Sequence, residues 1–151
     1  IEAMNGMMHG CLQAGLAFSN ASLGAVHAMA HSLGGYLDMP HGECNSILLE
    51  HVIDLNFESA MERYREIALR MGVFVEGYAD GEVKAALMKR IHTMRVDLGI
   101  NDYAYTAEVN ESILDNLTDG ALSDPCMVTN PKKVTREEVK RIYGTILREK
   151  G

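Results

Sequence analysis

Apolar side chains recur at intervals of three and four residues along most of the chain, which is the period of an α-helix rather than of a strand. The first segment with this period covers residues 1–18, and its many methionines and leucines predict a buried helix. The second segment covers residues 23–33. Residues typical of helix ends flank it: Ser19, Asn20 and Ser22 are expected to cap its beginning, and Gly34 and Gly35 to end it.

The third helix is marked by a proline at its start. Pro40 is tolerated in the first turn of a helix, so a helix is expected to begin near His41 and to end near Asn56. Two further amphipathic patterns, over residues 59–71 and 80–98, each place a row of apolar side chains on one face. Both segments are predicted to be helices that pack against a core.

Two helices near the C-terminus carry recognisable N-terminal caps. Asn110 is placed to cap a helix that runs through Leu117, and Thr135 with Glu138 has the capping-box pattern before the last apolar segment. No stretch alternates between apolar and polar residues for long. The pattern therefore predicts an all-α fold, a compact bundle of about six to eight helices formed by residues 1–151.

The composition narrows the class of protein. The chain has 151 residues, of which 47% are hydrophobic, and this suffices for one domain with an apolar core. A net charge of -7 with scattered basic residues argues against a nucleic-acid partner. No apolar run reaches the length needed to span a bilayer, so no membrane partner is expected. The three cysteines include no CxxC pair, which suits a reducing compartment, and a cytoplasmic protein is expected.

The candidate chemistry is concentrated around three histidines. On a helix, His27 and His31 lie one turn apart, so they share a face with Cβ atoms roughly 5 to 6 Å apart, and His41 follows after a short loop. Imidazole is a ligand for iron, zinc, copper and nickel. Ala28 stands where a metalloprotease of the HExxH type has its general-base glutamate, which argues against peptidase chemistry. An HxxxH pair alone is more often two ordinary histidines, but the small residues around this pair favour a site.

Three segments form a longer pattern: GLAFSNASLGAVHAMAH over residues 15–31, PHGECNSILL over residues 40–49, and DPC with TNP between residues 124 and 131. This pattern closely resembles the signature of the iron-containing alcohol dehydrogenase family (group III, dehydroquinate synthase-like superfold). The resemblance covers essentially the whole chain, and the double-histidine block is its most specific part. Glu50 stands where many members have a proline, which puts only the local helix geometry in question.

The resemblance implies different roles for neighbouring histidines. In that family the histidines that match His27 and His41 are metal ligands. The histidine that matches His31 lies beside the nicotinamide and the reacting carbon, which implies a catalytic role as a proton relay or a neutral donor; the alternative is a packing residue in the cleft. Phe18 matches an aromatic residue near the nicotinamide and is assigned to the cofactor site, although an aromatic residue at a helix end is more often core. The expected cofactors are a divalent metal, iron with zinc as the alternative, and NAD or NADP in the full-length enzyme.

The same resemblance implies that part of the enzyme is missing. The family's other two metal ligands and its nucleotide-binding domain lie upstream of the segment that residues 1–151 match. The chain is therefore expected to be the C-terminal metal-binding half, with the N-terminal nucleotide-binding domain absent. The complete enzyme would interconvert a small alcohol and its aldehyde or ketone by hydride transfer, with the metal as a Lewis acid that stabilises an alkoxide. The isolated chain is expected to be inactive, and its exposed interdomain face could favour a homo-oligomer.

Two other functions stay open at this point. A zinc-dependent glycerol dehydrogenase or a dehydroquinate synthase-like enzyme would use a similar metal site for other substrates. A helical interaction module that inherited this domain without its catalysis is the alternative from a different class. The block GAVHAMAH favours the alcohol dehydrogenase.

The remaining polar candidates receive structural interpretations. Cys126 either faces the active-site cavity or is a buried, inert thiol. Asp38 precedes a methionine and a proline and is interpreted as a turn residue rather than a ligand. His9, His51 and His92 lack a partner at ligand spacing and are interpreted as ordinary structural residues.

Overall fold

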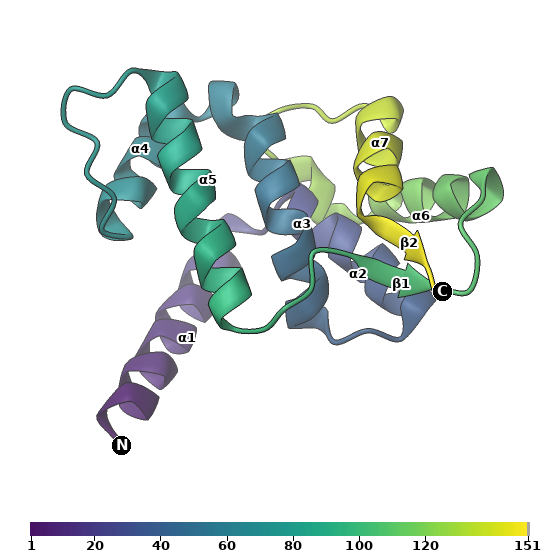
Figure 1. Cartoon of the computed structure of the whole chain (residues 1–151), viewed down its shortest axis with the longest axis horizontal. Coiled ribbons are helices and arrows are strands. Elements are labelled where there is room, and N and C mark those ends of the chain that lie inside the picture. The colour runs from purple at the N-terminus through teal and green to yellow at the C-terminus, as the bar shows by residue number, and fades with distance from the viewer. Residues whose placement is uncertain (151) are drawn as a thin grey trace.

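The structure is a computed structural model that describes residues 1–150, and it is mainly helical (Figure 1). Its α-helices are α1 (Glu2–Ala21), α2 (Ala25–Leu37), α3 (His41–Asn56), α4 (Met61–Arg70), α5 (Asp80–Asp97), α6 (Glu111–Ser123) and α7 (Arg136–Ile146). Two short 3-10 helices are η1 (Phe57–Ser59) and η2 (Pro125–Thr129). The predicted all-α fold is confirmed, with seven α-helices in the described part of the chain.

One small sheet was not predicted. Strands β1 (Ala104–Thr106) and β2 (Leu147–Glu149) pair in parallel, with Ala104 opposite Leu147. Each strand has three residues, which is too short for an alternating pattern to be recognised in the sequence. The pair holds the end of α7 against the segment that follows α5 (Figure 1). None of the helices within residues 1–150 has both the length and the apolar character needed to cross a membrane.

The predicted caps of the later helices are confirmed. The side-chain oxygen of Asn110 accepts the backbone N–H of Ile113 at 3.0 Å and begins α6, which continues beyond the predicted end to Ser123. Thr135 and Glu138 form the reciprocal capping box of α7, with the Thr135 N–H donating to the Glu138 carboxylate at 2.9 Å. Both caps are local, because donor and acceptor lie three residues apart.

The C-terminal end of α2 differs from the prediction. Gly34 and Gly35 stay inside the helix, which continues to Leu37 and ends at Asp38 with the left-handed φ of 52°. Aspartate tolerates this conformation better than most residues. Gly34 is needed for another reason: a Cβ at this position would lie 3.3 Å from the carbonyl oxygen of Met39, so the chain can turn back closely towards α3.

The N-terminal cap of α2 also differs from the prediction. Ser19 and Asn20 donate back to carbonyls of α1 and do not cap α2. The first N–H of α2, from Ala25, is accepted at 3.1 Å by the side-chain oxygen of Asn130, which is 105 residues away in the sequence. Asn130 also forms a reciprocal amide pair with the buried Asn56, with both bonds at 2.8 Å. The cap therefore comes from tertiary structure.

The predicted burial of the first helix is wrong. Helix α1 forms, but it has no buried residue and projects away from the rest of the molecule (Figure 1). At its C-terminal end Ser22 has a φ of 61°, which non-glycine residues rarely adopt, and the chain changes direction there. Five of its apolar side chains are 60–69% exposed: Met4, Met7, Met8, Leu12 and Leu16. The helical period predicts the helix but not a partner that covers it.

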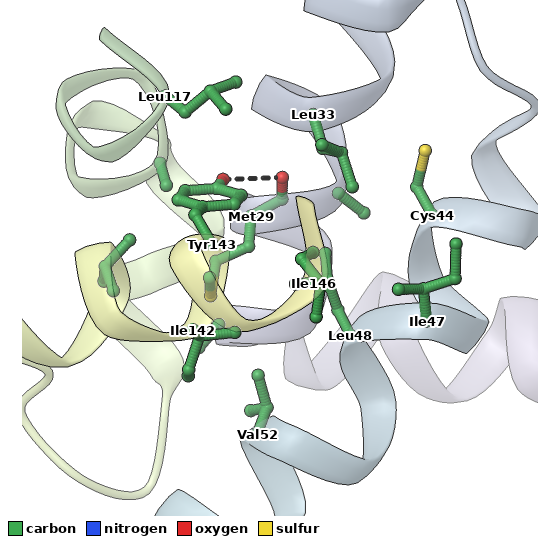
Figure 2. Close-up of a cluster of buried hydrophobic side chains, with 14 of the residues drawn as sticks. Met29, Leu33, Cys44, Ile47, Leu48, Val52, Leu117, Ile142, Tyr143 and Ile146 are labelled. Atoms are coloured by element: carbon green, nitrogen blue, oxygen red, sulfur yellow. Dashed lines mark hydrogen bonds between the residues drawn. The ribbon is translucent and has the colours of Figure 1, made fainter. Parts of the chain in front are cut away.

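Two hydrophobic clusters form the core and share α3. The larger lies between α2, α3, α6 and α7 and surrounds Tyr143, which is fully buried (Figure 2). The Tyr143 O–H donates to the carbonyl of Met29 at 2.8 Å, so the last helix is tied to α2. The smaller cluster lies between α3, α4 and α5, around Phe57 and Leu87. Helix α2, which carries two of the candidate histidines, is therefore packed on several sides.

Helix α3 is uninterrupted at the position where the resemblance left its geometry in question. It begins at His41, directly after Pro40, and ends at Asn56, as predicted. Glu50 lies within it and accepts from the buried Arg95 of α5 at about 3 Å. The carboxylate therefore links the two helices.

Candidate functional site

Three imidazole rings meet at one place on the surface of the helical body. His27 and His31 lie one turn apart on α2, and His41 is the first residue of α3. The turn at Asp38 brings α3 back along α2, so His41 lies beside both. The ring centres are 5.3 Å apart for His27 and His41, 5.2 Å for His31 and His41, and 6.2 Å for His27 and His31.

The angles between the ring planes distinguish two possible metal ligands, His27 and His41, from the third ring, His31. An imidazole binds a metal through a lone pair that lies in the ring plane. The planes of His27 and His41 are tilted by 50°, so their lone pairs can converge on one ion. Nitrogens about 2.1 Å from an ion in tetrahedral geometry leave ring centres about 5 Å apart, which agrees with the observed separation. His31 stacks on His41 with an angle of 20°, a face-to-face arrangement that does not aim both rings at one ion.

The electrostatics favour a neutral His27. Burial lowers the pKa of His27 from its ordinary value, and the nearby rings of His41 and His31 lower it further, while the carboxylate of Asp124 acts in the opposite direction. A neutral imidazole keeps the lone pair that a metal needs. The two imidazoles, with His27 favoured in its neutral form, therefore fit a borderline divalent ion such as iron or zinc.

Asn45 is a site residue that the sequence analysis missed. It lies one helical turn after His41 on α3, and its amide nitrogen is 2.8 Å from His41 Nε2 and 3.0 Å from the His41 carbonyl oxygen. Its side-chain oxygen is buried and has no hydrogen-bond partner within the described residues. The site thus contains a buried acceptor that its own contacts leave unsatisfied. The spacing of four residues from His41 was the available signal.

Asp124 is a second residue that the sequence analysis did not place in the site. It lies between α6 and η2, and its Oδ2 is 2.9 Å from His31 Nδ1. Its other oxygen accepts the backbone N–H of Cys126 at 2.8 Å and caps η2. The side chain of Asp124 is 16% exposed, whereas that of His31 is 42% exposed. The sequence signal was an aspartate before Pro125, which is typical of a cap and reveals nothing about a distant histidine.

His31, Asp124 and Cys126 together form a compact cluster of possible metal ligands. The ligating atoms of His31, Asp124 and Cys126 all lie within 4.8 Å of one another. Burial works against ionisation of Asp124, but hydrogen bonds from His31 and Cys126 outweigh it, so the pKa of this carboxyl is lowered. The pKa of the Cys126 thiol is raised, first by burial and then by its contact with Asp124. A protonated thiol is a poor ligand, so the chemistry of this cluster favours a hydrogen-bonded aspartate–histidine pair.

An apolar cavity of about 650 Å³ opens beside the histidines. His27 and Asn45 lie at its polar side, and Ile53, Ile67 and Met94 are among the apolar residues that line the rest. Phe18 lies at the exposed end of α1, is 47% exposed and is not among the lining residues. Its assignment to a cofactor site stays a prediction.

The other polar candidates lie apart from the three rings. Asp38 is a turn residue, as predicted. His92 is on α5 near Glu50 and Arg95, His51 is half-buried on α3, and His9 is exposed on α1. These positions agree with their interpretation as structural residues.

Comparisons with known proteins place these features in a family context. A model of the C-terminal part of the Fe-containing alcohol dehydrogenase family matches residues 1–147. The chain is 38% identical over 144 residues to lactaldehyde reductase of Escherichia coli (strain K12), which covers 95% of this chain and 38% of that protein. It is 36% identical over 143 residues to 1,3-propanediol dehydrogenase of Klebsiella pneumoniae, with 95% and 37% covered.

The fold is similar to that of a solved alcohol dehydrogenase from Oenococcus oeni. The TM-score is 0.80 at 34% sequence identity, over 88% of this chain and 35% of that one. The chain thus spans little more than a third of the length of the relatives it matches.

Proposed function

The chain belongs to the Fe-containing alcohol dehydrogenase family, and from this premise we propose that it forms the metal-binding part of a nicotinamide-dependent alcohol dehydrogenase. The observation that carries the proposal is the proximity of His27 and His41, whose ring centres lie 5.3 Å apart with planes tilted by 50°. These two histidines are the metal ligands of the proposal. Iron is the proposed metal, and zinc is the alternative for the same nitrogen donors.

Each residue of the site has a defined task in this proposal. His27 is favoured in its neutral form by burial, which lowers its pKa, and offers its lone pair. The Asn45 amide, 2.8 Å from His41 Nε2, would give up this contact to the ion. A bound ion would supply Lewis-acid polarisation of the substrate oxygen. His31 lies beside the two ligand rings but stacks rather than converges, so it is free to handle a proton next to the reacting atoms. Phe18 is proposed to contact the cofactor from the end of α1.

The proposed substrate is a small alcohol or its aldehyde. Two relatives carry names that refer to lactaldehyde and 1,3-propanediol, which are both small. NAD or NADP would carry the hydride, and it would be bound by a nucleotide-binding half outside residues 1–151. The exposed apolar face of α1 supports contact with such a half or with a second copy of the chain. The free cysteines of the described residues support a cytoplasmic location.

The two protein ligands are fewer than the three that catalytic zinc sites usually keep. We therefore expect the 151-residue chain alone to bind a divalent ion weakly and to show no dehydrogenase turnover. Rapid NAD-dependent oxidation of a small alcohol by the purified chain would contradict this part of the proposal.

The main test uses the complete gene product and combines metal analysis with steady-state rates. His27→Ala and His41→Ala are expected to remove the bound metal and the activity together. His31→Ala is expected to retain the metal while kcat falls. His9→Ala, an exposed histidine on α1, is the matched control and should change neither quantity. Loss of metal in His31→Ala to the extent seen in His27→Ala would refute the division of roles.

A further inference from the structure

We propose that Asp124 is a positioning residue that holds the His31 imidazole in one tautomer, with the proton on Nδ1 and a bare Nε2. The catalytic meaning of this tautomer rests on the proposed function, whereas the tautomer itself follows from the contacts of this chain. It also chooses between two roles for His31 that the sequence left open, because a ring with a bare Nε2 accepts a proton there and does not donate one while neutral.

The first step of the argument is the contact itself. His31 Nδ1 and Asp124 Oδ2 are 2.9 Å apart, a distance typical of a hydrogen bond. An ionised carboxylate only accepts hydrogen bonds, so the proton between these atoms belongs to Nδ1. The contacts from His31 and Cys126 hold the pKa of Asp124 below its usual value despite burial, and the carboxylate is ionised at neutral pH. Neutral His31 then carries its single proton on Nδ1.

The second step is that Asp124 is held firmly and by a different part of the chain. Its backbone has the extended conformation that the following proline favours, with φ -71° and ψ 131°. Its Oδ1 accepts the Cys126 N–H at 2.8 Å, so only Oδ2 is left for the histidine. His31 is 93 residues away on α2. The fold therefore holds Asp124 and His31 in position independently of each other. Carboxylate–histidine pairs of this kind fix the orientation of the imidazole ring at metal sites and in the active sites of hydrolases.

The third step concerns the reaction. In alcohol oxidation the substrate loses one proton from its hydroxyl and one hydride from its carbon, and becomes the carbonyl compound. A bound nicotinamide would supply the hydride acceptor, and we assign the proton to Nε2 of His31. The resulting imidazolium keeps its Nδ1–H bond to Asp124, whose negative charge stabilises it. In aldehyde reduction the same proton returns from Nε2 to the product oxygen.

The amide variant gives the sharpest test because the backbone fixes its orientation. In Asp124→Asn the side-chain oxygen must still accept the Cys126 N–H, since the NH₂ group would face that donor unfavourably. The NH₂ group is then directed at His31 Nδ1, which must present a lone pair. We expect the tautomer to reverse, with the proton on Nε2. Asp124→Ala removes the acceptor and is expected to leave both tautomers populated.

The measurement is a long-range ¹H–¹⁵N correlation on the ¹⁵N-labelled 151-residue chain at about pH 8; this experiment distinguishes both neutral tautomers from the imidazolium. His31 is expected to show Nδ1–H alone in the parent chain, and Nε2–H in Asp124→Asn. His9, exposed on α1, is the internal reference for a free imidazole. Asp119→Asn is the matched control, because Asp119 is a carboxylate on α6 that pairs with Arg136 and not with a histidine. This control should leave the His31 tautomer unchanged.

Three results would overturn the proposal. The first is a His31 in the parent chain with the same tautomer mixture as His9. The second is an unchanged His31 tautomer in a folded Asp124→Asn. The third is a thiolate-to-metal charge-transfer band with added cobalt(II) that disappears in Cys126→Ser, because the cluster would then be a metal site rather than a hydrogen-bonded pair. Far-UV circular dichroism of each variant establishes that it is folded.

Steady-state kinetics of the complete gene product test whether the His31 tautomer matters for catalysis. Asp124→Asn is expected to lower kcat about 10- to 100-fold with KM and metal content unchanged. Equal loss of kcat in Asp119→Asn would overturn the assignment. Different results would refute the proposed metal ligands and the proposed role of Asp124. Full metal content in His27→Ala would refute the ligands and leave the tautomer result unaffected. An unchanged tautomer in Asp124→Asn would refute only the positioning role.

Discussion

The packing of α2 against α6 depends on the absence of a side chain at Gly120. A Cβ built there would lie 2.7 Å from Ser32 Oγ and 3.3 Å from Ser32 Cβ, and the first distance is shorter than real contacts of this kind. Ser32 cannot rotate away freely, because its hydroxyl donates to the carbonyl of Leu117 at 2.9 Å. Gly120→Ala should therefore force apart α2, which carries His31, and α6, which directly precedes Asp124.

Two opposing contributions determine how much Gly120→Ala changes the free energy of unfolding. Alanine in place of glycine within a helix stabilises by about 0.5–1 kcal/mol. Overpacking of a tight contact costs about 1–3 kcal/mol, and part of that cost here is the lost hydroxyl bond of Ser32, about 1 kcal/mol. The two terms differ by about 0 to 2.5 kcal/mol, so Gly120→Ala is expected to destabilise the chain by about 1 kcal/mol, which lowers Tm by about 2–4 °C. Gly144→Ala, on α7 with open space around it, should instead stabilise by about 0.5–1 kcal/mol.

The assay is urea unfolding followed by circular dichroism, with the two alanine variants measured side by side. A double-mutant cycle with Ser32→Ala isolates the clash, because it removes Oγ and leaves only the 3.3 Å contact. In the Ser32→Ala background, Gly120→Ala should leave the free energy of unfolding almost unchanged. Stabilisation by Gly120→Ala equal to that by Gly144→Ala would show that the two helices are not in the close contact described. Failure of Ser32→Ala to relieve the cost would exclude the hydroxyl as its source.

Three further outcomes test the core, the long-range cap and the buried histidines. Tyr143→Phe removes the hydroxyl that donates to Met29 and should lower the free energy of unfolding by about 1 kcal/mol, and an unchanged value would mean that this bond is not formed. Asn130→Ala removes the cap of α2 and its paired amide bonds and should cost about 2–4 kcal/mol in the same assay. Burial is the main cause that lowers the pKa of His27 and His51 from 6.5, so the unfolded chain binds more protons below that pH and stability should fall as the pH falls from about 7.5 to about 5.5. This loss should be smaller in His51→Gln, and an equal loss would exclude His51 as a contributor.

Much of the secondary structure could be predicted because its causes are local. The helical period, the cap at Asn110 and the capping box at Thr135 each depend on residues within one or two turns, and all are present in the structure. The family could be predicted from the double-histidine block, and the match over residues 1–147 confirms it. The end of α2 was placed too early because Gly34 allows a close backbone approach instead of ending the helix.

The candidate site could be predicted only in part. The spacing of His27 and His31 placed them on one helix face, whereas the tilt that distinguishes His27 from His31 depends on how α3 lies against α2. Asn45 was within reach of sequence reasoning, since it follows His41 by one turn. Asp124 was not, because no local pattern connects it with a histidine 93 residues earlier.

By itself the sequence determined which segments are helical, which family they represent and which histidines share a face, since these properties arise from neighbours along the chain. Only the tertiary structure decided that α1 is exposed, that Asn130 caps α2 and that a carboxylate reaches His31. The physical reason is that burial, ring tilt and hydrogen-bond partners depend on groups brought together across many residues. A helical period specifies an apolar face but not the surface that covers it.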